Sequence, residues 1–265
     1  MSQPQPLVLY DIPYTVSGKA CSPNPWKARL ALTMKGIPHK TIWVEYPDIA
    51  TVCKEIGVKS TTTPAAIASG APQYTLPVLQ DHNTGALISD SFNIALYLDK
   101  TYPHTIRLIP EGTDAFQAMC VDVFVEKMLL PLALIYAVEA SESLSPRSTE
   151  YFRRTREAAF GKRLEELSPE GPVRDAHWKQ CLDGLTVVQG WTNENRNGGE
   201  SLYIMGDTPS FADVVIVSIL ICIKALAGAE SDGWRVLMEA NRGHWARLVA
   251  AFDQWIWVDE ESTKP

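Results

Sequence analysis

The chain has 265 residues, of which 46% are hydrophobic and 21% are charged, and its formal net charge is −7. This length suits two domains with sizeable cores, and the acidic balance argues against a nucleic-acid partner, which usually requires a basic face. The five cysteines are scattered without the spacing of a zinc site, and the first residues have neither the basic nor the apolar segment of a signal peptide. We therefore expect a cytoplasmic protein with reduced thiols and no metal.

The first part of the chain alternates short strands with helices. Trp26, Leu30 and Met34 recur at four-residue spacing before Gly36, which is typical of a helix that ends at a glycine. Residues 81–85 join two apolar runs, as the loop of a hairpin does. The predicted elements are a strand at 7–10, a helix at 23–35, a strand at 41–44, a helix at 46–57, a loop at 58–75, strands at 76–80 and 86–88, and a helix from about 90 to 102. One crossover followed by a hairpin and a helix describes a compact α/β domain.

Only helices are predicted after these elements. Apolar residues between Ala115 and Leu130 lie on one helical stripe, which Pro131 should kink. Further helices are predicted at 148–167, 175–193, 210–227 and 235–256. We therefore expect an α/β domain at residues 1–104, followed by an all-α domain at residues 110–265.

The most apolar stretch of the chain runs from Val214 to Ile223, between Asp213 and Lys224. A membrane-spanning helix needs about 20 apolar residues, roughly twice this length, so we interpret the stretch as a buried core helix. Just before it, Ser210 and Asp213 have the spacing of a capping box, with Asp in place of the usual Glu. Their expected role is to start this helix, not to take part in chemistry.

Ser22 and Pro23 mark the start of the first predicted helix. Ser is a preferred N-cap residue, and Pro is favoured at the first helical position. A helix start concentrates unpaired N–H groups and the positive end of the helix dipole, so it stabilises a thiolate placed there, and the Ser22 hydroxyl would add a hydrogen bond. A plain helix cap explains the same two residues without any chemistry.

Two further places suit a peptide-like ligand. If the Leu76–Pro77 bond is cis, Leu76 turns its backbone N–H and C=O outward, where an extended peptide can pair with them; a trans proline at an edge strand is the alternative. At the start of the next helix, Asp90 offers a carboxylate for an ammonium group, and Ser91 offers a hydroxyl and an N–H for a carboxylate. Helix capping alone is the alternative there.

These features occur in one order on one predicted architecture, and together they resemble the glutathione transferase superfamily over nearly the whole chain. The resemblance implies a thioredoxin-like first domain, a helical second domain and a cis proline at Pro77. Within the superfamily the chain is most similar to the fungal-specific, etherase-related class A. The segments that carry this likeness are DIP (11–13), GKA (18–20), SPN (22–24), WK (26–27), YTLPV (74–78), SDS (89–91) and YLDKTYP (97–103).

The resemblance implies a transferase that activates the thiol of glutathione with Ser22. Glutathione would lie along Leu76 and Pro77, with its γ-glutamyl end at Asp90 and Ser91. The attacked substrate would be electrophilic and aromatic, such as a phenolic compound or an aryl ether, in a detoxification role toward xenobiotic compounds. A homodimer is expected from the resemblance alone.

Five further residues are weaker candidates for this site. Lys59, in the long predicted loop, is a candidate for the glycine carboxylate of glutathione. The expected apolar pocket for the second substrate is bounded by Tyr14, Met119, Phe124 and Tyr136, all of which also suit a core.

Cys21 is the main departure from the family pattern, because cysteine-type members place the catalytic cysteine directly before the proline, where this chain has Ser22. Two alternatives therefore stay open. One is a glutathione-dependent thiol transferase or reductase that uses Cys21. The other is a ligandin, which binds aromatic molecules without turnover.

Overall fold

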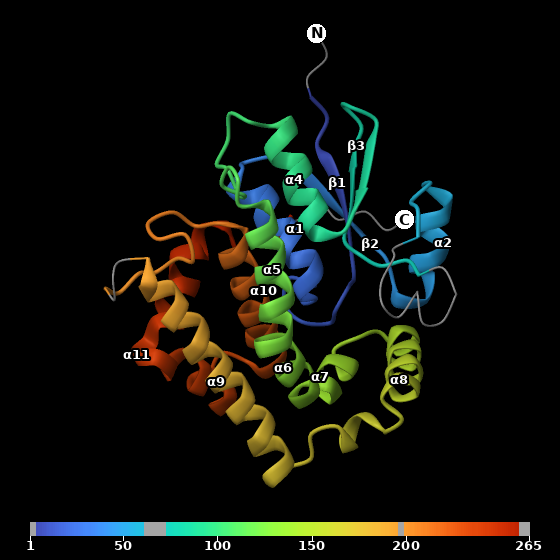
Figure 1. Cartoon of the computed structure of the whole chain (residues 1–265). Helices are drawn as coiled ribbons and strands as arrows, with labels where there is room; N and C mark the ends of the chain where they lie inside the picture. Colours follow the sequence, from blue (N-terminus) through green and yellow to red (C-terminus); the bar gives the residue numbers. More distant parts are fainter. Residues whose placement is uncertain (1–3, 61–72, 196–198, 260–265) are drawn as a thin grey trace.

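The structure, a computed structural model, describes residues 4–60, 73–195 and 199–259. Its first part holds a four-stranded sheet in the order β2–β1–β3–β4 (Figure 1). The strands are β1 (Leu7–Asp11), β2 (His39–Trp43), β3 (Val78–Asp81) and β4 (Ala86–Ser89). β1 and β2 are parallel, with Leu9 opposite Thr41, and β3 is antiparallel to both of its neighbours, with Leu79 opposite Leu9. The predicted crossover and hairpin are both present.

Helices cover both faces of the sheet. Successive side chains of a strand point to opposite faces, so Leu9 packs in the cluster that includes α1 (Pro23–Met34) and α4 (Ser91–Thr101). Tyr10 packs on the other face, in the cluster that includes α2 (Ile49–Glu55). This is why β1 is a continuous apolar run and not an alternating one.

The second part of the chain is helical, as predicted. Its helices are α5 (Asp114–Phe124), α6 (Leu130–Ile135), α7 (Ala137–Glu142), α8 (Pro146–Phe160), α9 (Pro172–Glu194), α10 (Phe211–Ala227) and α11 (Asp232–Phe252). The irregularity predicted at Pro131 is a π-helical segment, Val125–Leu129, between α5 and α6. Pro131 has no N–H to donate to the carbonyl of Lys127. A Cβ at Gly184 of α9 would lie only 2.6 Å from that carbonyl oxygen, so this crossing requires glycine.

Two predicted boundaries move for local reasons. The strand predicted at 76–80 begins only at Val78, because Pro77 cannot donate to the ladder. The helix predicted at 148–167 ends before Gly161, which adopts φ 66° and caps it in the left-handed conformation.

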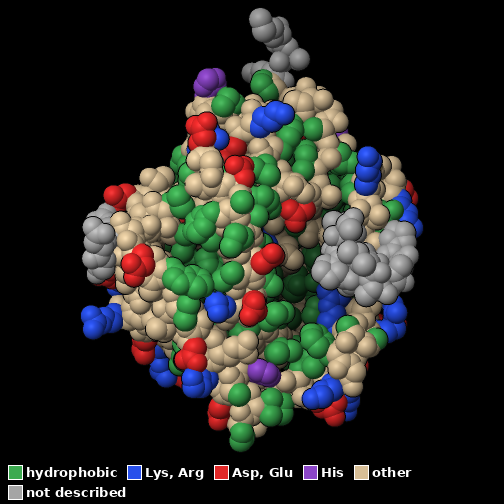
Figure 2. Space-filling view, in the orientation of Figure 1, with side chains coloured by type: hydrophobic (Ala, Val, Ile, Leu, Met, Phe, Trp, Pro, Cys, Tyr) green, Lys and Arg blue, Asp and Glu red, His purple; other side chains and the backbone are tan. Residues whose placement is uncertain are grey.

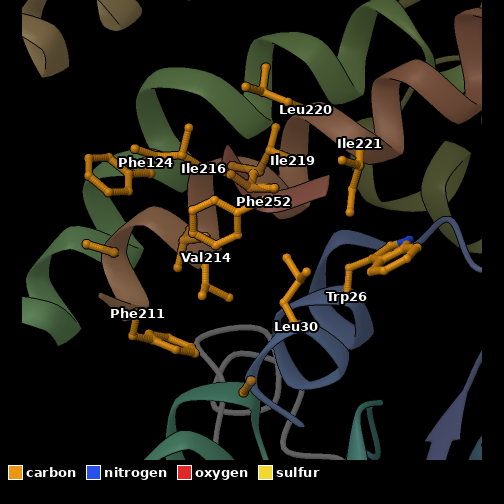
Figure 3. Close-up of a cluster of buried hydrophobic side chains, with 14 of the residues drawn as sticks. Trp26, Leu30, Phe124, Phe211, Val214, Ile216, Ile219, Leu220, Ile221 and Phe252 are labelled. Carbon is orange, nitrogen blue, oxygen red and sulfur yellow. The ribbon is translucent and has the colours of Figure 1, made fainter. Parts of the chain in front are cut away.

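α10 is the core helix that the sequence predicts, and every residue from Phe211 to Ile223 is buried. Its apolar side chains pack with Phe124 and Phe252 of the helical part and with Trp26 and Leu30 of α1 (Figure 3). Because α1 belongs to the α/β part, this contact joins the two parts of the chain. The described residues include no helix that is both long and apolar enough to cross a membrane.

The predicted capping box starts α10. Asp213 Oδ2 accepts hydrogen bonds from the N–H of Ser210 at 2.8 Å and from its hydroxyl at 3.0 Å, and Oδ1 accepts from the N–H of Ile204 at 2.9 Å. Burial raises the pKa of Asp213 to about 6, although these hydrogen bonds oppose the shift. The structural role expected for the Ser210–Asp213 pair is therefore confirmed.

A buried arginine ties α1 to the sheet and to the last described residues. Arg29 is fully buried, and its guanidinium lies 2.8 Å from Asp11 Oδ2 and 3.0 Å from Asp259 Oδ1. Asp259 also accepts the backbone N–H of Thr41 in β2 at 2.7 Å. Burial raises the pKa of Asp11, and the positive charge of Arg29 opposes that shift. The network compensates carboxylates that water does not reach.

Candidate active site

Ser22 is the N-cap residue of α1, and two prolines make the first turn of this helix unusual. Pro23 and Pro25 have no N–H, so Asn24 holds the only N–H among the first three helical residues. An N-cap hydroxyl usually accepts from the second or third helical N–H. Here the third position is Pro25, and Ser22 makes no capping hydrogen bond. The Ser22 hydroxyl and the Asn24 N–H are the donors that this helix start can offer to a ligand.

Both residues line a cleft of about 620 Å³ between the α/β part and α8. In the space-filling view, the face between α5 and α8 is hollowed (Figure 2). Side chains of the α/β part and side chains of α8 form opposite walls of the cleft. The α/β part contributes Ser22, Asn24, Tyr46 and Leu76, and α8 contributes Tyr151 and Arg156. A cleft with walls from two domains can hold two substrates side by side.

The helix predicted at 46–57 is in fact a 3₁₀ turn at Tyr46–Asp48 followed by α2, and the turn forms part of the cleft wall. The Tyr46 N–H donates to Ser148 Oγ of α8 at 3.1 Å. The Arg147 guanidinium donates to the Asp48 carboxylate, with one N–O distance of 2.6 Å. These bonds fix the turn against α8.

The Leu76–Pro77 peptide bond is cis. Leu76 lines the cleft, and the pairing of β3 with β4 begins only at Val78. The backbone of Leu76 therefore lies beyond the sheet ladder and beside Ser22, where an extended peptide can be received as an added strand.

Asp90 and Ser91 stand at the start of α4. Asp90 adopts φ 76° and ψ 133°, a region that non-glycine residues rarely occupy and that often marks a functional site. Its Oδ1 accepts from the N–H groups of Phe92 at 2.9 Å and Asn93 at 3.1 Å. The carboxylate is exposed, and Ser91 is buried beneath it. Asp90 thus caps the helix and presents negative charge to solvent at the same time.

A buried cation lies below this corner. Burial lowers the pKa of Lys27 to about 8, and the nearby charges of Asp90 and Asp122 oppose the shift. Lys27 belongs to α1, five positions after Ser22 along the chain. The corner around Asp90 therefore contains both signs of charge.

Cys21 points away from the cleft. Its side chain is fully buried, and its Sγ lies 3.4 Å from Cys222 Sγ and 3.7 Å from the carbonyl oxygen of Cys222, on α10. The Cys21 hydrogen bond and burial hold the pKa of Cys222 well above its usual range. Cys21 therefore faces the core between the two parts of the chain, whereas its neighbour Ser22 faces the cleft.

The structure does not bring the remaining candidates into the cleft. Tyr14 is buried and meets the cleft only through Tyr46, whose hydroxyl lies 3.2 Å from its own. Met119 and Phe124 line a separate apolar pocket of about 390 Å³. Tyr136 is buried in the core, edge-on to Trp178. Lys59 is exposed and does not line the cleft. These side chains lie on faces of their elements that turn to other neighbours.

Sequence reasoning missed the aromatic wall that takes their place. Tyr46, Tyr151 and Phe160 line the cleft, and Tyr46 stacks on Tyr151 with ring centroids 6.4 Å apart. The signal in the sequence was the Tyr151-Phe152 pair within an otherwise polar helix. Among the residues that the structure describes, no three His, Cys, Asp or Glu side chains are grouped to hold a metal ion.

Comparison with known proteins agrees with this geometry. Residues 21–101 match the family model of the glutathione S-transferase N-terminal domain, and residues 115–255 match that of the C-terminal domain. The chain is 30% identical to the glutathione S-transferase-like protein ustS of Aspergillus flavus, over 96% of this chain and 92% of ustS. It therefore belongs to the glutathione S-transferase family.

Two solved structures are similar over nearly the whole chain. One is a glutathione S-transferase of Ceriporiopsis subvermispora in complex with glutathione, with 42% identity, a TM-score of 0.90 and coverage of 97% of this chain and 100% of that one. The other is glutathione transferase GSTFuA3 from Phanerochaete chrysosporium, with 40% identity, a TM-score of 0.90 and the same coverage. The thioredoxin-like first part and the helical second part are the fold of this family.

Proposed function

We propose that this chain activates the thiol of glutathione with Ser22 and transfers its sulfur to an electrophilic aromatic substrate. The observation that carries the proposal is the start of α1. There the Ser22 hydroxyl makes no capping hydrogen bond and lines the same cleft as the backbone of Leu76. A relative of 42% identity was crystallised with glutathione, which supports this cleft as the glutathione site.

Glutathione would pair with the backbone of Leu76 as an extended peptide. Its γ-glutamyl ammonium group would meet the exposed carboxylate of Asp90, and its α-carboxylate would meet the hydroxyl and N–H of Ser91. Its sulfur would then reach Ser22 and Asn24. Two donors and the positive end of the helix dipole favour the thiolate over the thiol, so the thiol pKa falls.

The thiolate would attack an electrophilic carbon, forming a carbon–sulfur bond while the leaving group departs with the electron pair of the broken bond. Ser22 donates a hydrogen bond throughout and does not act as the nucleophile. The rings of Tyr46, Tyr151 and Phe160 suit an aromatic substrate, such as a phenolic compound or an aryl ether, since offset ring stacking adds to the burial of apolar area.

The proposal is tested by assaying the purified chain with glutathione and three kinds of second substrate: aryl halides, model aryl ethers and mixed disulfides. We expect conjugation of the aromatic electrophiles. Turnover of mixed disulfides alone would instead favour the thiol transferase that uses Cys21. Tight binding of aromatic dyes without turnover of any substrate would favour the ligandin.

Asp90 allows recognition of glutathione to be separated from helix capping. Asn keeps a side-chain oxygen for the cap and tolerates positive φ, so Asp90→Asn should retain α4 while losing the charge. We expect the KM for glutathione to rise about 10- to 100-fold, the range for a hydrogen bond to a charged group, with an unchanged Tm. Asp90→Ala should raise KM as much and also lower Tm. An unchanged KM in both variants would remove Asp90 from the glutathione site.

Three further expectations belong to the proposal. We place the two domains at residues 1–104 and 110–265, on either side of the coil between α4 and α5. A homodimer is supported by the exposure of Phe116 and Met119, at 45% and 65%, on α5. A cytoplasmic location is supported by five cysteines that are all unpaired.

A further inference from the structure

The cleft has an unusual balance of charge. Among its described lining residues, Arg156 alone carries a full charge, and neither Asp nor Glu is present. The hydrogen bond of the Arg156 side chain goes to the neutral hydroxyl of Thr155, at 3.0 Å. Its remaining contacts are with aromatic rings, and the segment 61–72 contains no acidic residue in its sequence. A guanidinium has five N–H donors, so most of those of Arg156 are available to a ligand.

Other arginines of α8 show the contrast. Arg147 pairs with Asp48, and Arg153 pairs with Glu157 at 3.1 Å and with Glu165 at 2.5 Å. Both of these side chains satisfy their charge on the surface of the molecule. Arg156 lies on the face of the same helix that turns to the cleft, where the protein supplies no carboxylate.

Aromatic rings hold the Arg156 guanidinium in place before any ligand arrives. Its Cζ lies 4.6 Å from the ring centroid of Phe152 and 5.3 Å from that of Tyr46. The two rings meet edge-on, with centroids 5.6 Å apart. Cation–π contact leaves the edge of the guanidinium free to bind a carboxylate through two N–H groups. A cation fixed in this way loses little conformational entropy on binding.

We propose that Arg156 determines specificity by binding a carboxylate on the aromatic second substrate. The inference rests on the proposed function and names its substrate class, which is aryl electrophiles that carry an acidic group. Tyr46 and Tyr151 form the wall for the ring, and Arg156 touches Tyr46, so the group that it binds is a substituent of that ring. Glutathione already uses Asp90 and Ser91 at its γ-glutamyl end and Ser22 at its sulfur.

The test compares a chloronitrobenzoate with its uncharged carboxamide, both conjugated by displacement of chloride. In Arg156→Gln we expect the ratio of KM for the benzoate to KM for the carboxamide to rise about 10- to 100-fold. Arg156→Lys keeps the charge without the fork and should fall between the two. Arg154→Gln is the matched control, because Arg154 stacks on Tyr151 but does not line the cleft. It should leave the ratio unchanged.

Three outcomes would overturn the inference. The first is an unchanged ratio in Arg156→Gln. The second is an equal loss for both compounds, which would indicate a structural or general field effect. The third is a rise in KM for glutathione that disappears with the monoethyl ester of its glycine carboxylate, which would assign Arg156 to glutathione itself.

Equilibrium binding keeps this test separate from the proposed function. Calorimetry with an unreactive nitrobenzoate and its carboxamide measures the carboxylate preference without turnover. Loss of that preference in Arg156→Gln supports the inference even if no electrophile is conjugated, whereas absence of any preference in the unmodified chain overturns it. Failure of conjugation with intact carboxylate binding would contradict only the proposed transferase activity.

Discussion

Replacing Ser22 with alanine is expected to lower kcat/KM for glutathione conjugation by about 10- to 100-fold at neutral pH, while the chain stays folded. The lost interaction is a hydrogen bond to a charged sulfur, which is worth about 1.5 to 3 kcal/mol. Ser22 makes no capping hydrogen bond in the structure, so its removal costs the helix little. The backbone N–H of Asn24 and the helix dipole remain, and they account for the residual activity.

The pH profile identifies the cause of that loss. Without the Ser22 hydroxyl, the pKa of bound glutathione rises by about one to two units, since each unit corresponds to about 1.36 kcal/mol. The reactive species is the thiolate, so the profile of kcat/KM should shift to higher pH and the deficit should shrink as the pH rises. Thiolate absorbance in the ultraviolet measures the same shift directly.

Cys21→Ser is the matched control, because it changes the preceding residue, which faces α10 and not the cleft. We expect it to retain the activity and pH profile of the unmodified chain. If Cys21→Ser abolished activity while Ser22→Ala did not, the enzyme would be a cysteine-type thiol transferase. Unchanged kcat/KM in Ser22→Ala would remove Ser22 from the chemistry.

Replacing Arg29 with methionine should destabilise the fold by about 3 to 5 kcal/mol, the usual cost of removing one partner of a buried ion pair. Arg29 is fully buried between Asp11 and Asp259. Methionine fills much of its volume but leaves the carboxylate of Asp11 uncompensated. Urea denaturation measures the loss as a lower midpoint. Arg147→Met is the control: it breaks an exposed pair with Asp48, so its midpoint should not change measurably.

The pH dependence of Arg29→Met follows from Asp11. Burial already raises the pKa of Asp11, and Arg29 opposes that shift. Without Arg29 the folded-state pKa rises further above the unfolded value, so the folded state binds the extra proton. Stability then falls as the pH rises through the folded pKa, and the variant should be closer to the unmodified chain at about pH 5 than at about pH 8. A pH-independent difference would contradict this account.

Much of the glutathione half of the site is legible in the sequence because its signals are local. The Ser22-Pro23 helix start and the Ser210–Asp213 capping box each depend on neighbouring residues, and both occur where predicted. The same holds for the apolar run from Val214 to Ile223, whose composition alone requires burial. Local chemistry sets the ends of helices, so a few adjacent letters carry the information.

The second-substrate half was not legible, since it depends on which helix face meets which neighbour. Met119 and Phe124 share an apolar stripe on α5, and the stripe borders a different pocket. The actual wall brings Tyr46 together with Tyr151, which lie about a hundred residues apart and are joined through the packing of α8 on a short 3₁₀ turn. Periodicity predicts that a face is buried, but not against what.

By itself, the sequence determined the fold class, the start of α1 and the core character of α10, because composition and neighbouring residues decide these. Only the tertiary structure decided which of two adjacent side chains reaches the cleft. Ser22 and Cys21 stand side by side at one helix start, yet Cys21 lies against Cys222 of α10, 3.4 Å away. Packing between the two parts of the chain turns the thiol inward and leaves the hydroxyl of Ser22 facing the cleft, since a chain segment cannot point both side chains the same way.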